Sequence, residues 1–335
     1  MTKSTPRVTI TDVARTAGVS LSTVSRVMND NPTVDAVLAG RVRAVAAELG
    51  YSANPVARSL VLGRTQTVAV VIPDLANPTF QAILRGLSRA AAEDGYHVLI
   101  ADTAEQVAEE RVLASTTRRR TDGVILCAPR LPQDELAALL PSLSPAVVIN
   151  RPPQAGAPTV AADYGSAMAE LVAHLYALGH RRIAFLSGAV GSASGAARRA
   201  ALDGARTAHA DLEIVELPVG VDFDSGAAAA DAVLATGVTA ALAFNDLVAM
   251  GLLSAVAARG VRVPEDLSVT GFDDIPFAPY TTPPLTTAAV PAAELGRRAW
   301  GAMSALLAGG EAAEAAVTLR PEVVLRGSTG PAPTP

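Results

Sequence analysis

Two different patterns of apolar positions divide the chain near residue 66. In the first fifty residues, apolar side chains recur at helical spacing in three short segments, 10–16, 21–28 and 34–49. Gly18 breaks the chain between the first two segments, Ser20 is a good N-cap for the second, and Gly50 is a good C-cap for the third. The pattern predicts a small bundle of three helices, the first two joined by a tight turn.

Beyond residue 66, short apolar runs alternate with longer segments of helical periodicity. Eight runs have the length and composition of strands: 68–72, 96–100, 123–126, 146–149, 183–187, 213–217, 240–244 and 267–271. Helical segments lie between them at 80–94, 165–178, 196–208, 225–235 and 246–259. This βαβ order predicts parallel sheets with helices on both faces, and two separate series of strands predict two lobes.

Length and composition fit a chain of two or three domains. The chain has 335 residues, of which 50% are hydrophobic, and it has a single cysteine, Cys127, in an apolar run. No apolar run reaches about 18 residues, and the first thirty residues are polar where a signal peptide needs an apolar stretch. We therefore expect a cytoplasmic protein with no membrane partner. The proline-rich segment 328–335 is expected to be a disordered tail.

Charge is distributed unevenly along the chain. Residues 1–64 contain eight Lys and Arg against four Asp and Glu, whereas the rest contains 19 basic and 28 acidic residues. A basic head on an acidic body favours a polyanionic partner for the head alone. A major groove accepts one helix, so the second helix of the bundle is the candidate DNA reader.

Enzyme chemistry is weakly supported by the sequence. The loop 188–195 follows a strand and precedes a helix, but its glycines do not have the GxGxxG spacing of a dinucleotide site, even with Glu213 or Glu216 downstream. The four histidines have no metal or triad spacing, and Asp273 and Asp274 are adjacent on a strand end and point in different directions. We expect no catalytic residue, metal or cofactor, and an NAD-dependent enzyme is a remote alternative.

The segments 8–29 and 49–60 closely resemble the head and hinge of the lactose/galactose repressor (LacI/GalR) family, and the resemblance covers about residues 7–327. It implies an all-α helix-turn-helix head joined to an α/β two-lobed core similar to periplasmic binding proteins. The implied divisions are a head at 1–51, a hinge helix and linker at 52–65, and a core at 66–327. Its N-lobe would comprise 66–162 and 292–319, and its C-lobe 163–290 and 320–327.

The resemblance also implies roles in DNA binding. Leu21 and Ser22 match the variable base-reading positions, and Arg26 matches an arginine that reads guanine through its fork of donors. Positions that hold phosphates are matched by Ser20, Thr23, Ser25, Asn29, Tyr51 and Asn54. The helical wheel instead turns Leu21 inward, where it would be a capping apolar contact.

The hinge segment of the family folds into a helix on DNA and inserts a leucine from each subunit into the minor groove. Leu60 occupies that position here, and Ala57 and Arg58 belong to the same DNA-binding segment, where we expect Arg58 to contact phosphate. Two recognition helices and two inserted leucines, one of each from each subunit, require a homodimer. Its operator would be palindromic, with a flexible base-pair step at the centre.

In the core, segments at successive strand ends resemble the cleft of the family. The implied polar clamps of the effector are Asn150, Arg198, Asn245 and Asp273, with Asp74 in the first strand-end segment. Phe80 is the expected stacking platform, because Thr79 and Val221 stand where many members have an aromatic residue. Donors and acceptors in one set suit the hydroxyls of a sugar. A nucleoside, a phosphorylated sugar and another small metabolite are the alternatives.

The sequence thus predicts a DNA-binding transcriptional regulator, a repressor of carbohydrate-metabolism genes whose operator binding is controlled by a small-molecule effector. The same fold acting as an activator or a co-repressed regulator, with a nucleoside or phosphorylated effector, is the alternative, because the sign of regulation depends on where the operator lies.

Overall fold

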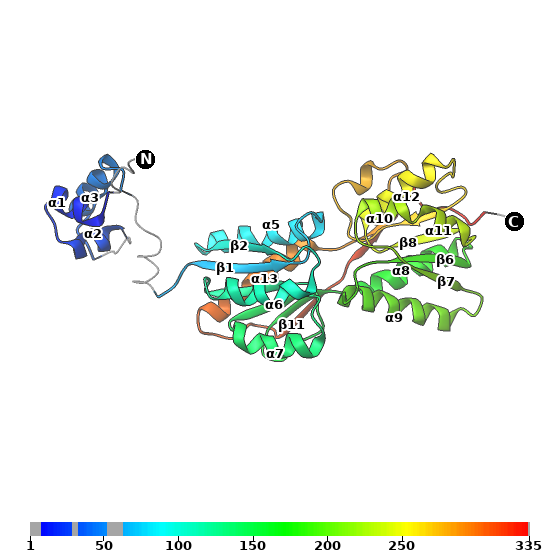
Figure 1. Cartoon of the computed structure of the whole chain (residues 1–335), viewed down its shortest axis with the longest axis horizontal. Coiled ribbons are helices and arrows are strands. Elements are labelled where there is room, and N and C mark those ends of the chain that lie inside the picture. Colours follow the sequence, from blue (N-terminus) through cyan, green and yellow to red (C-terminus); the bar gives the residue numbers. More distant parts are fainter. Residues whose placement is uncertain (1–7, 29–32, 52–62, 334–335) are drawn as a thin grey trace. The chain divides into compact units, whose positions relative to one another are not determined.

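The computed structural model describes residues 8–28, 33–51 and 63–333 (Figure 1). The chain forms two compact units, residues 1–66 and 67–335. The first is helical and the second is built from parallel sheets and helices. Within the described residues, no helix is long and apolar enough to cross a membrane.

The described residues of the first unit contain three helices: α1 (Ile10–Ala17), α2 (Leu21–Met28) and α3 (Ala36–Glu48). Thr9 and Asp12 form a reciprocal capping box at the start of α1, and Gly18 ends it in the left-handed conformation at φ 65°. The helices pack around a core that includes Val13, Val24 and other buried apolar residues. The third helix begins at Ala36 rather than 34, because the carboxylate of Asp35 accepts hydrogen bonds from the amides of Val37 and Leu38.

The N-lobe of the second unit is a six-stranded parallel sheet in the order β11-β5-β4-β3-β1-β2. Its strands are β1 (Thr67–Ile72), β2 (His97–Asp102), β3 (Gly123–Cys127), β4 (Ala146–Ile149), β5 (Thr159–Ala162) and β11 (Ala316–Leu319). Alternate strand residues pack on α5 (Pro78–Glu93) and α13 (Ala292–Leu307). The others pack on α6 (Val107–Arg118) and α7 (Gln133–Leu143). The sheet is therefore covered on both faces.

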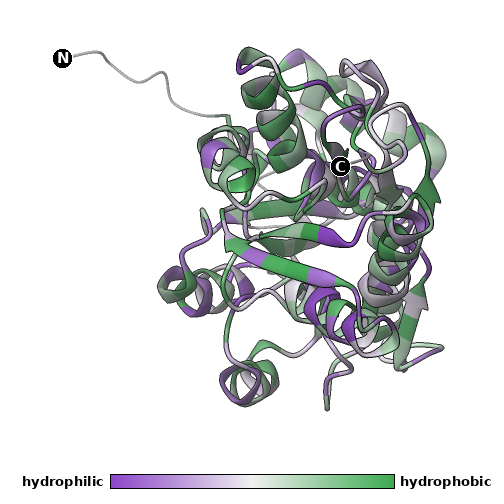
Figure 2. Ribbon diagram, turned by 90° about the vertical axis from the view of Figure 1, so that its right-hand side faces the viewer, coloured by the Kyte–Doolittle hydropathy of each residue, from purple (hydrophilic) through white to green (hydrophobic). Residues whose placement is uncertain are grey.

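The C-lobe is a four-stranded parallel sheet in the order β7-β6-β8-β9. Its strands are β6 (Arg182–Ser187), β7 (Glu213–Pro218), β8 (Ala240–Ala243) and β9 (Ser268–Thr270). One face packs on α8 (Tyr164–Ala177) and α9 (Ala193–Ala208). The other packs on α10 (Phe223–Ala228), α11 (Ala230–Ala235) and α12 (Asp246–Ala258). In Figure 2 the strands carry mostly hydrophobic residues and hydrophilic residues gather on the outer helices.

Four short strands were not anticipated from the apolar pattern: β5, β10 (Thr287–Ala289), β11 and β12 (Glu322–Val324). β10 and β12 pair antiparallel where the chain passes between the lobes. The 225–235 helix expected from the sequence is two helices, α10 and α11, joined at Ala229. A short 3-10 helix, η1 (Ala278–Tyr280), follows β9.

The predicted disorder of the tail is wrong for residues 328–333. Ser328 is fully buried, donates a hydrogen bond to the Val269 carbonyl and accepts one from the Thr286 amide. The Gly330 carbonyl accepts from the buried ring of His180. The low apolar content of the tail misled the prediction, because hydrogen bonds to the C-lobe, rather than apolar burial, hold these residues.

Helices α5 and α13 approach closely because each carries a glycine at the contact. A β-carbon on Gly86 would lie 2.0 Å from the Ala293 carbonyl oxygen, and one on Gly296 would lie 2.0 Å from that of Ile83. Such a separation is far inside van der Waals contact, so any side chain would force the helices apart. This close contact holds α5 in place on the sheet. The same helix supplies residues that line the cleft between the lobes.

We expect Gly296→Ala to lower the free energy of unfolding by about 1–3 kcal/mol, because the added methyl overpacks the α5–α13 contact. Gly301 on the same helix is the matched control, since a β-carbon there would meet nothing within 4 Å. Gly301→Ala should be neutral or gain up to about 1 kcal/mol from helix propensity. Urea unfolding followed by circular dichroism compares the two variants, and equal midpoints would contradict the contact.

Candidate functional site

The exposed face of α2 is the first candidate site. Leu21 is 48% exposed, Ser22 and Arg26 are exposed, and Val24 and Val27 on the opposite side are buried in the core. The inward orientation that the helical wheel gave to Leu21 is therefore wrong, and Leu21, the first residue of the helix, lies outside the packed core. The start and one side of the helix are thus exposed to solvent at Leu21, Ser22 and Arg26.

Hydroxyl groups cluster at the N-terminus of α2. The Ser20 oxygen lies 2.8 Å from the hydroxyls of both Ser22 and Thr23, and it accepts a hydrogen bond from the Thr23 amide. Hydroxyls and amides at a helix N-terminus are suitable donors for phosphate oxygens. Ser25 and Tyr51 are partly exposed. The other predicted DNA contacts, Asn29, Asn54, Ala57, Arg58 and Leu60, lie outside the described residues.

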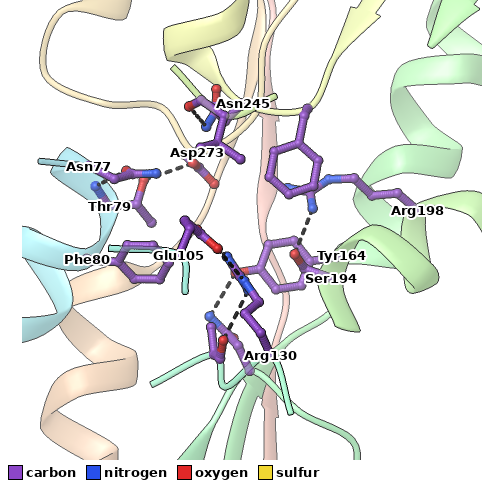
Figure 3. A pocket seen from close by; sticks show the side chains of 14 residues that line it. Asn77, Thr79, Phe80, Glu105, Arg130, Tyr164, Ser194, Arg198, Asn245 and Asp273 are labelled. Carbon is purple, nitrogen blue, oxygen red and sulfur yellow. Dashed lines mark hydrogen bonds and ion pairs between the residues drawn. The ribbon is translucent and has the colours of Figure 1, made fainter. Parts of the chain in front are cut away.

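The second candidate site is a cavity between the lobes, at the carboxyl ends of strands from both sheets (Figure 3). The N-lobe contributes Asn77, Thr79, Phe80, Glu105, Ala128, Arg130 and Asn150, and the C-lobe contributes Tyr164, Ser194, Arg198, Val221, Phe244, Asn245 and Asp273. The carboxyl end of a parallel sheet is where α/β proteins bind ligands. Five of the six predicted effector residues lie here: Phe80, Asn150, Arg198, Asn245 and Asp273.

Asp74 is the predicted effector residue that does not line the cavity. Its carboxylate accepts a hydrogen bond from the Ala76 amide in the turn after β1. Burial raises its pKa, and the negative charges of Asp102 and Glu105 act in the same direction. In this structure Asp74 shapes the turn that leads into α5.

Arg198 is the most buried charge of the cavity, at 1% exposure. Its guanidinium carbon lies 4.0 Å from the ring centroid of Phe272 and 4.6 Å from those of Tyr164 and Phe244. One terminal nitrogen donates to the Ser194 hydroxyl, whereas its buried Nε has no hydrogen-bond partner among the described residues. Burial lowers the pKa of Arg198, and the negative charge of Asp273 opposes that shift. The aromatic faces offset part of the cost of burying this cation.

Asp273 faces the cavity from the loop after β9. Its backbone has φ 111°, in the region that favours glycine, and Thr79 donates a hydrogen bond of 2.9 Å to its Oδ2 atom. Burial raises the pKa of Asp273 to about 6, and the positive charge of Arg198 and the Thr79 hydrogen bond limit the shift. Near neutral pH the group is an acceptor held in a strained, fixed position.

Both polar atoms of each asparagine side chain form a hydrogen bond. Asn150 accepts from the Ala162 amide through Oδ1 and donates from Nδ2 to the Tyr164 hydroxyl at 2.9 Å. Asn245 caps α12 by accepting from the Val248 amide, and its Nδ2 donates to the Val221 carbonyl. Both side chains are therefore fixed in orientation.

An ion pair on the N-lobe wall was missed by the sequence analysis. Arg130 is bound to Glu105 by two hydrogen bonds of 2.9 and 2.8 Å, and a third donor of Arg130 binds the Ala128 carbonyl. Such a bidentate pair fixes both side chains. Glu105 follows β2 and Arg130 follows β3, so examining every strand end for polar residues would have found them.

The cavity is nearly filled by its own side chains. Its free volume is about 30 Å³, which is room for about two water molecules. A sugar ring enters only if the lobes or the lining side chains move.

Comparison with known proteins identifies both parts of the chain. Residues 9–54 match the family described as bacterial regulatory proteins, lacI family, and residues 172–329 match the periplasmic binding protein-like domain. The HTH-type transcriptional repressor CytR of Escherichia coli (strain K12) is 32% identical over 96% of both chains. The chain belongs to the LacI family. It is a DNA-binding transcriptional regulator with an effector-binding domain.

Other members are similar in sequence and structure. The ribose operon repressor of Escherichia coli (strain K12) is 31% identical over 87% of this LacI-family chain and 90% of its own. The lac repressor dimer bound to operator and the anti-inducer ONPF has 29% identity and a TM-score of 0.87, covering 97% of this chain and 99% of that one. The CelR–cellobiose complex has 28% identity and a TM-score of 0.67, with coverage of 96% and 100%. The predicted fold class, a helical head with two parallel α/β lobes, is confirmed.

Asp273 should give this regulator a pH-dependent stability. Because its pKa is about 6 in the folded chain against a usual value of 3.8, the folded state binds the proton more tightly than the unfolded state. The cost of burying the charge is present above pH 6 and is relieved as the pH falls through 6. The parent should therefore gain melting temperature relative to Asp273→Asn between pH 8 and pH 5.

Differential scanning calorimetry at four pH values measures this difference. Asp203→Asn, at an exposed position on α9, is the control for a change of carboxylate to amide. A difference between parent and Asp273→Asn that stays constant from pH 8 to pH 5 would show that Asp273 is not protonated in this range.

Proposed function

We propose that this LacI-family regulator is a homodimeric repressor of carbohydrate-metabolism genes whose operator binding is controlled by a neutral sugar. The observation that carries the proposal is the charge balance of the cleft. Its charged lining residues are two arginines, Arg130 and Arg198, and two carboxylates, Glu105 and Asp273. The lining thus has equal numbers of positive and negative side chains, a balance that fits an uncharged effector better than one that adds a phosphate or carboxylate.

The polar groups of the cleft also suit a sugar. Arg198 supplies donors, Asp273 supplies acceptors, and Asn150 and Asn245 supply both, which matches hydroxyls that donate and accept at once. Phe80 offers a ring to the apolar face of a sugar. A nucleoside is the second candidate, because Tyr164 and Phe244 bring two further aromatic rings on which a base could stack.

Exposed apolar residues support a homodimer. β2 is the last strand of its sheet, and Leu99 and Ile100 on it are 38% and 44% exposed. Val112 on α6 is 56% exposed, and on the C-lobe Phe277 and Tyr280 are exposed as well. An edge strand with exposed apolar side chains is a pairing surface unless another chain covers it. Two heads brought together in this way would read a palindromic operator with a flexible central step.

Arg26→Ala should reduce affinity for the cognate operator by about 1–3 kcal/mol and relax the preference at one guanine in each half-site. Arg26→Lys is the matched control for charge, because it keeps the cation but loses the bidentate fork. Fluorescence anisotropy with the operator and with single-base variants measures both effects. If Arg26→Ala weakens all sequences equally and Arg26→Lys restores the loss, Arg26 contacts phosphate instead.

Asp273→Ala and Arg198→Ala should each abolish effector binding, because each leaves buried ligand groups unpaired, and neither residue lies in the head. Calorimetry of the full chain with D-ribose, cellobiose and cytidine first identifies a ligand that binds the parent. Asp203→Ala, exposed on the same helix as Arg198, is the control. Unchanged affinity in both cleft variants would exclude the cleft as the effector site.

A further inference from the structure

Two hydrogen bonds cross the cleft between side chains of opposite lobes. Thr79, in the first turn of α5, donates to Oδ2 of Asp273 at 2.9 Å, and Asn150, after β4, donates to the hydroxyl of Tyr164 at 2.9 Å. In Figure 3, Thr79 and Asp273 face each other from the two lobes. Each bond engages one of the residues that the proposed function assigns to the effector.

The lobes also meet at a third point. Gly191 in the C-lobe has φ 78°, and a β-carbon there would lie 2.8 Å from the Arg130 carbonyl oxygen of the N-lobe. With contacts at three places, only about 30 Å³ remains free in the cavity. The structure is therefore a closed cleft in which the protein's own groups occupy the polar clamps.

We propose that Thr79 and Tyr164 are positioning residues that hold the effector-free cleft closed, by binding Asp273 and Asn150 until an effector displaces them. The proposal rests on the proposed function only in that the effector binds in this cleft.

The hydrogen bonds of the closed cleft explain how an effector can replace the contacts between the lobes. Asp273 and Asn150 are satisfied across the cleft, whereas the buried Nε of Arg198 has no partner among the described residues. An effector with several hydroxyls can replace both cross-lobe bonds and also supply an acceptor for Arg198. A closed state that must open before binding reduces the apparent affinity by the fraction of open protein.

Thr79 has the features of a residue placed for this contact. It is 7% exposed, and its amide donates to Asn77, the N-cap of α5, so the first turn of the helix fixes its position. A threonine is too short to pack over a ligand as an aromatic side chain would, but its hydroxyl reaches the carboxylate of the other lobe.

The test measures the distance between the lobes in the full chain without any effector. Spin labels are attached at Ser142→Cys on α7 and Thr207→Cys on α9, both exposed. Cys127 stays unlabelled, because it is buried and burial raises its thiol pKa to about 12. Labelled protein is mixed with excess unlabelled protein, so that double electron–electron resonance reports distances within one chain.

We expect the parent to show a short distance and Thr79→Val to increase the fraction at a longer distance about two- to tenfold, in line with the loss of one hydrogen bond. Thr79→Ser keeps the hydroxyl and should restore the parental distribution. The matched control is Thr121→Val, because Thr121 is a buried N-lobe threonine whose hydroxyl binds carbonyls of its own lobe. It should leave the distribution unchanged.

Tyr164→Phe tests the second bond and keeps the proposal falsifiable if Thr79→Val does not fold. It removes the hydroxyl and keeps the ring that stacks on Phe272. It should shift the distribution as Thr79→Val does. Parental distributions in every folded variant would overturn the proposal, as would an equal shift in Thr121→Val. Since no effector is present, these outcomes are independent of which sugar, if any, binds in the calorimetric panel.

Discussion

The arrangement of the core depends on one buried cation. Arg198 is carried by the first half of α9 into a space enclosed by three aromatic rings, with no carboxylate within ion-pair distance among the described residues. Burying a charge is costly unless its surroundings offset it, and here the ring faces, the Ser194 hydroxyl and the field of Asp273 do so. The positive charge of Arg198 also limits the rise in the pKa of Asp273, which stays near 6.

The same physical arrangement serves both closure and recognition. Parallel strands end at a common edge, and the polar residues at the ends of β4, β8 and β9 are brought to one cavity although they are far apart in the sequence. Because the carboxyl ends of both sheets border the same cavity, a donor of one lobe reaches an acceptor of the other. Any ligand of the cleft must therefore compete with contacts between the lobes, and its binding free energy is coupled to their separation.

Close packing of the helices keeps the lobes stiff while the cleft between them can change. In the N-lobe Gly86 and Gly296 let α5 and α13 touch, and in the C-lobe Gly226 and Gly251 do the same for α10 and α12. Close-packed interiors resist gradual deformation, so we expect movement between the lobes rather than within them. Each lobe can then act as a rigid body.

The sequence alone determined the features that depend on neighbouring residues. The helices of the head follow from apolar spacing, the N-cap Ser20 and the glycines at 18 and 50, and most strands of the core follow from buried apolar runs. The amino-acid sequence of the head was specific enough to indicate the family. The resemblance at the strand ends predicted five of the residues that line the cavity.

Tertiary structure decided the features that depend on residues distant in the chain. The hydrogen bond from Thr79 to Asp273 spans 194 residues, and the Arg130–Glu105 pair joins the ends of two strands. The short strands β5, β10, β11 and β12 exist because partners elsewhere pair with them, and Ser328 is buried because the C-lobe offers it hydrogen bonds. The local pattern of apolar residues indicates which side chains are buried. It does not indicate which distant polar group forms a hydrogen bond with a buried polar side chain.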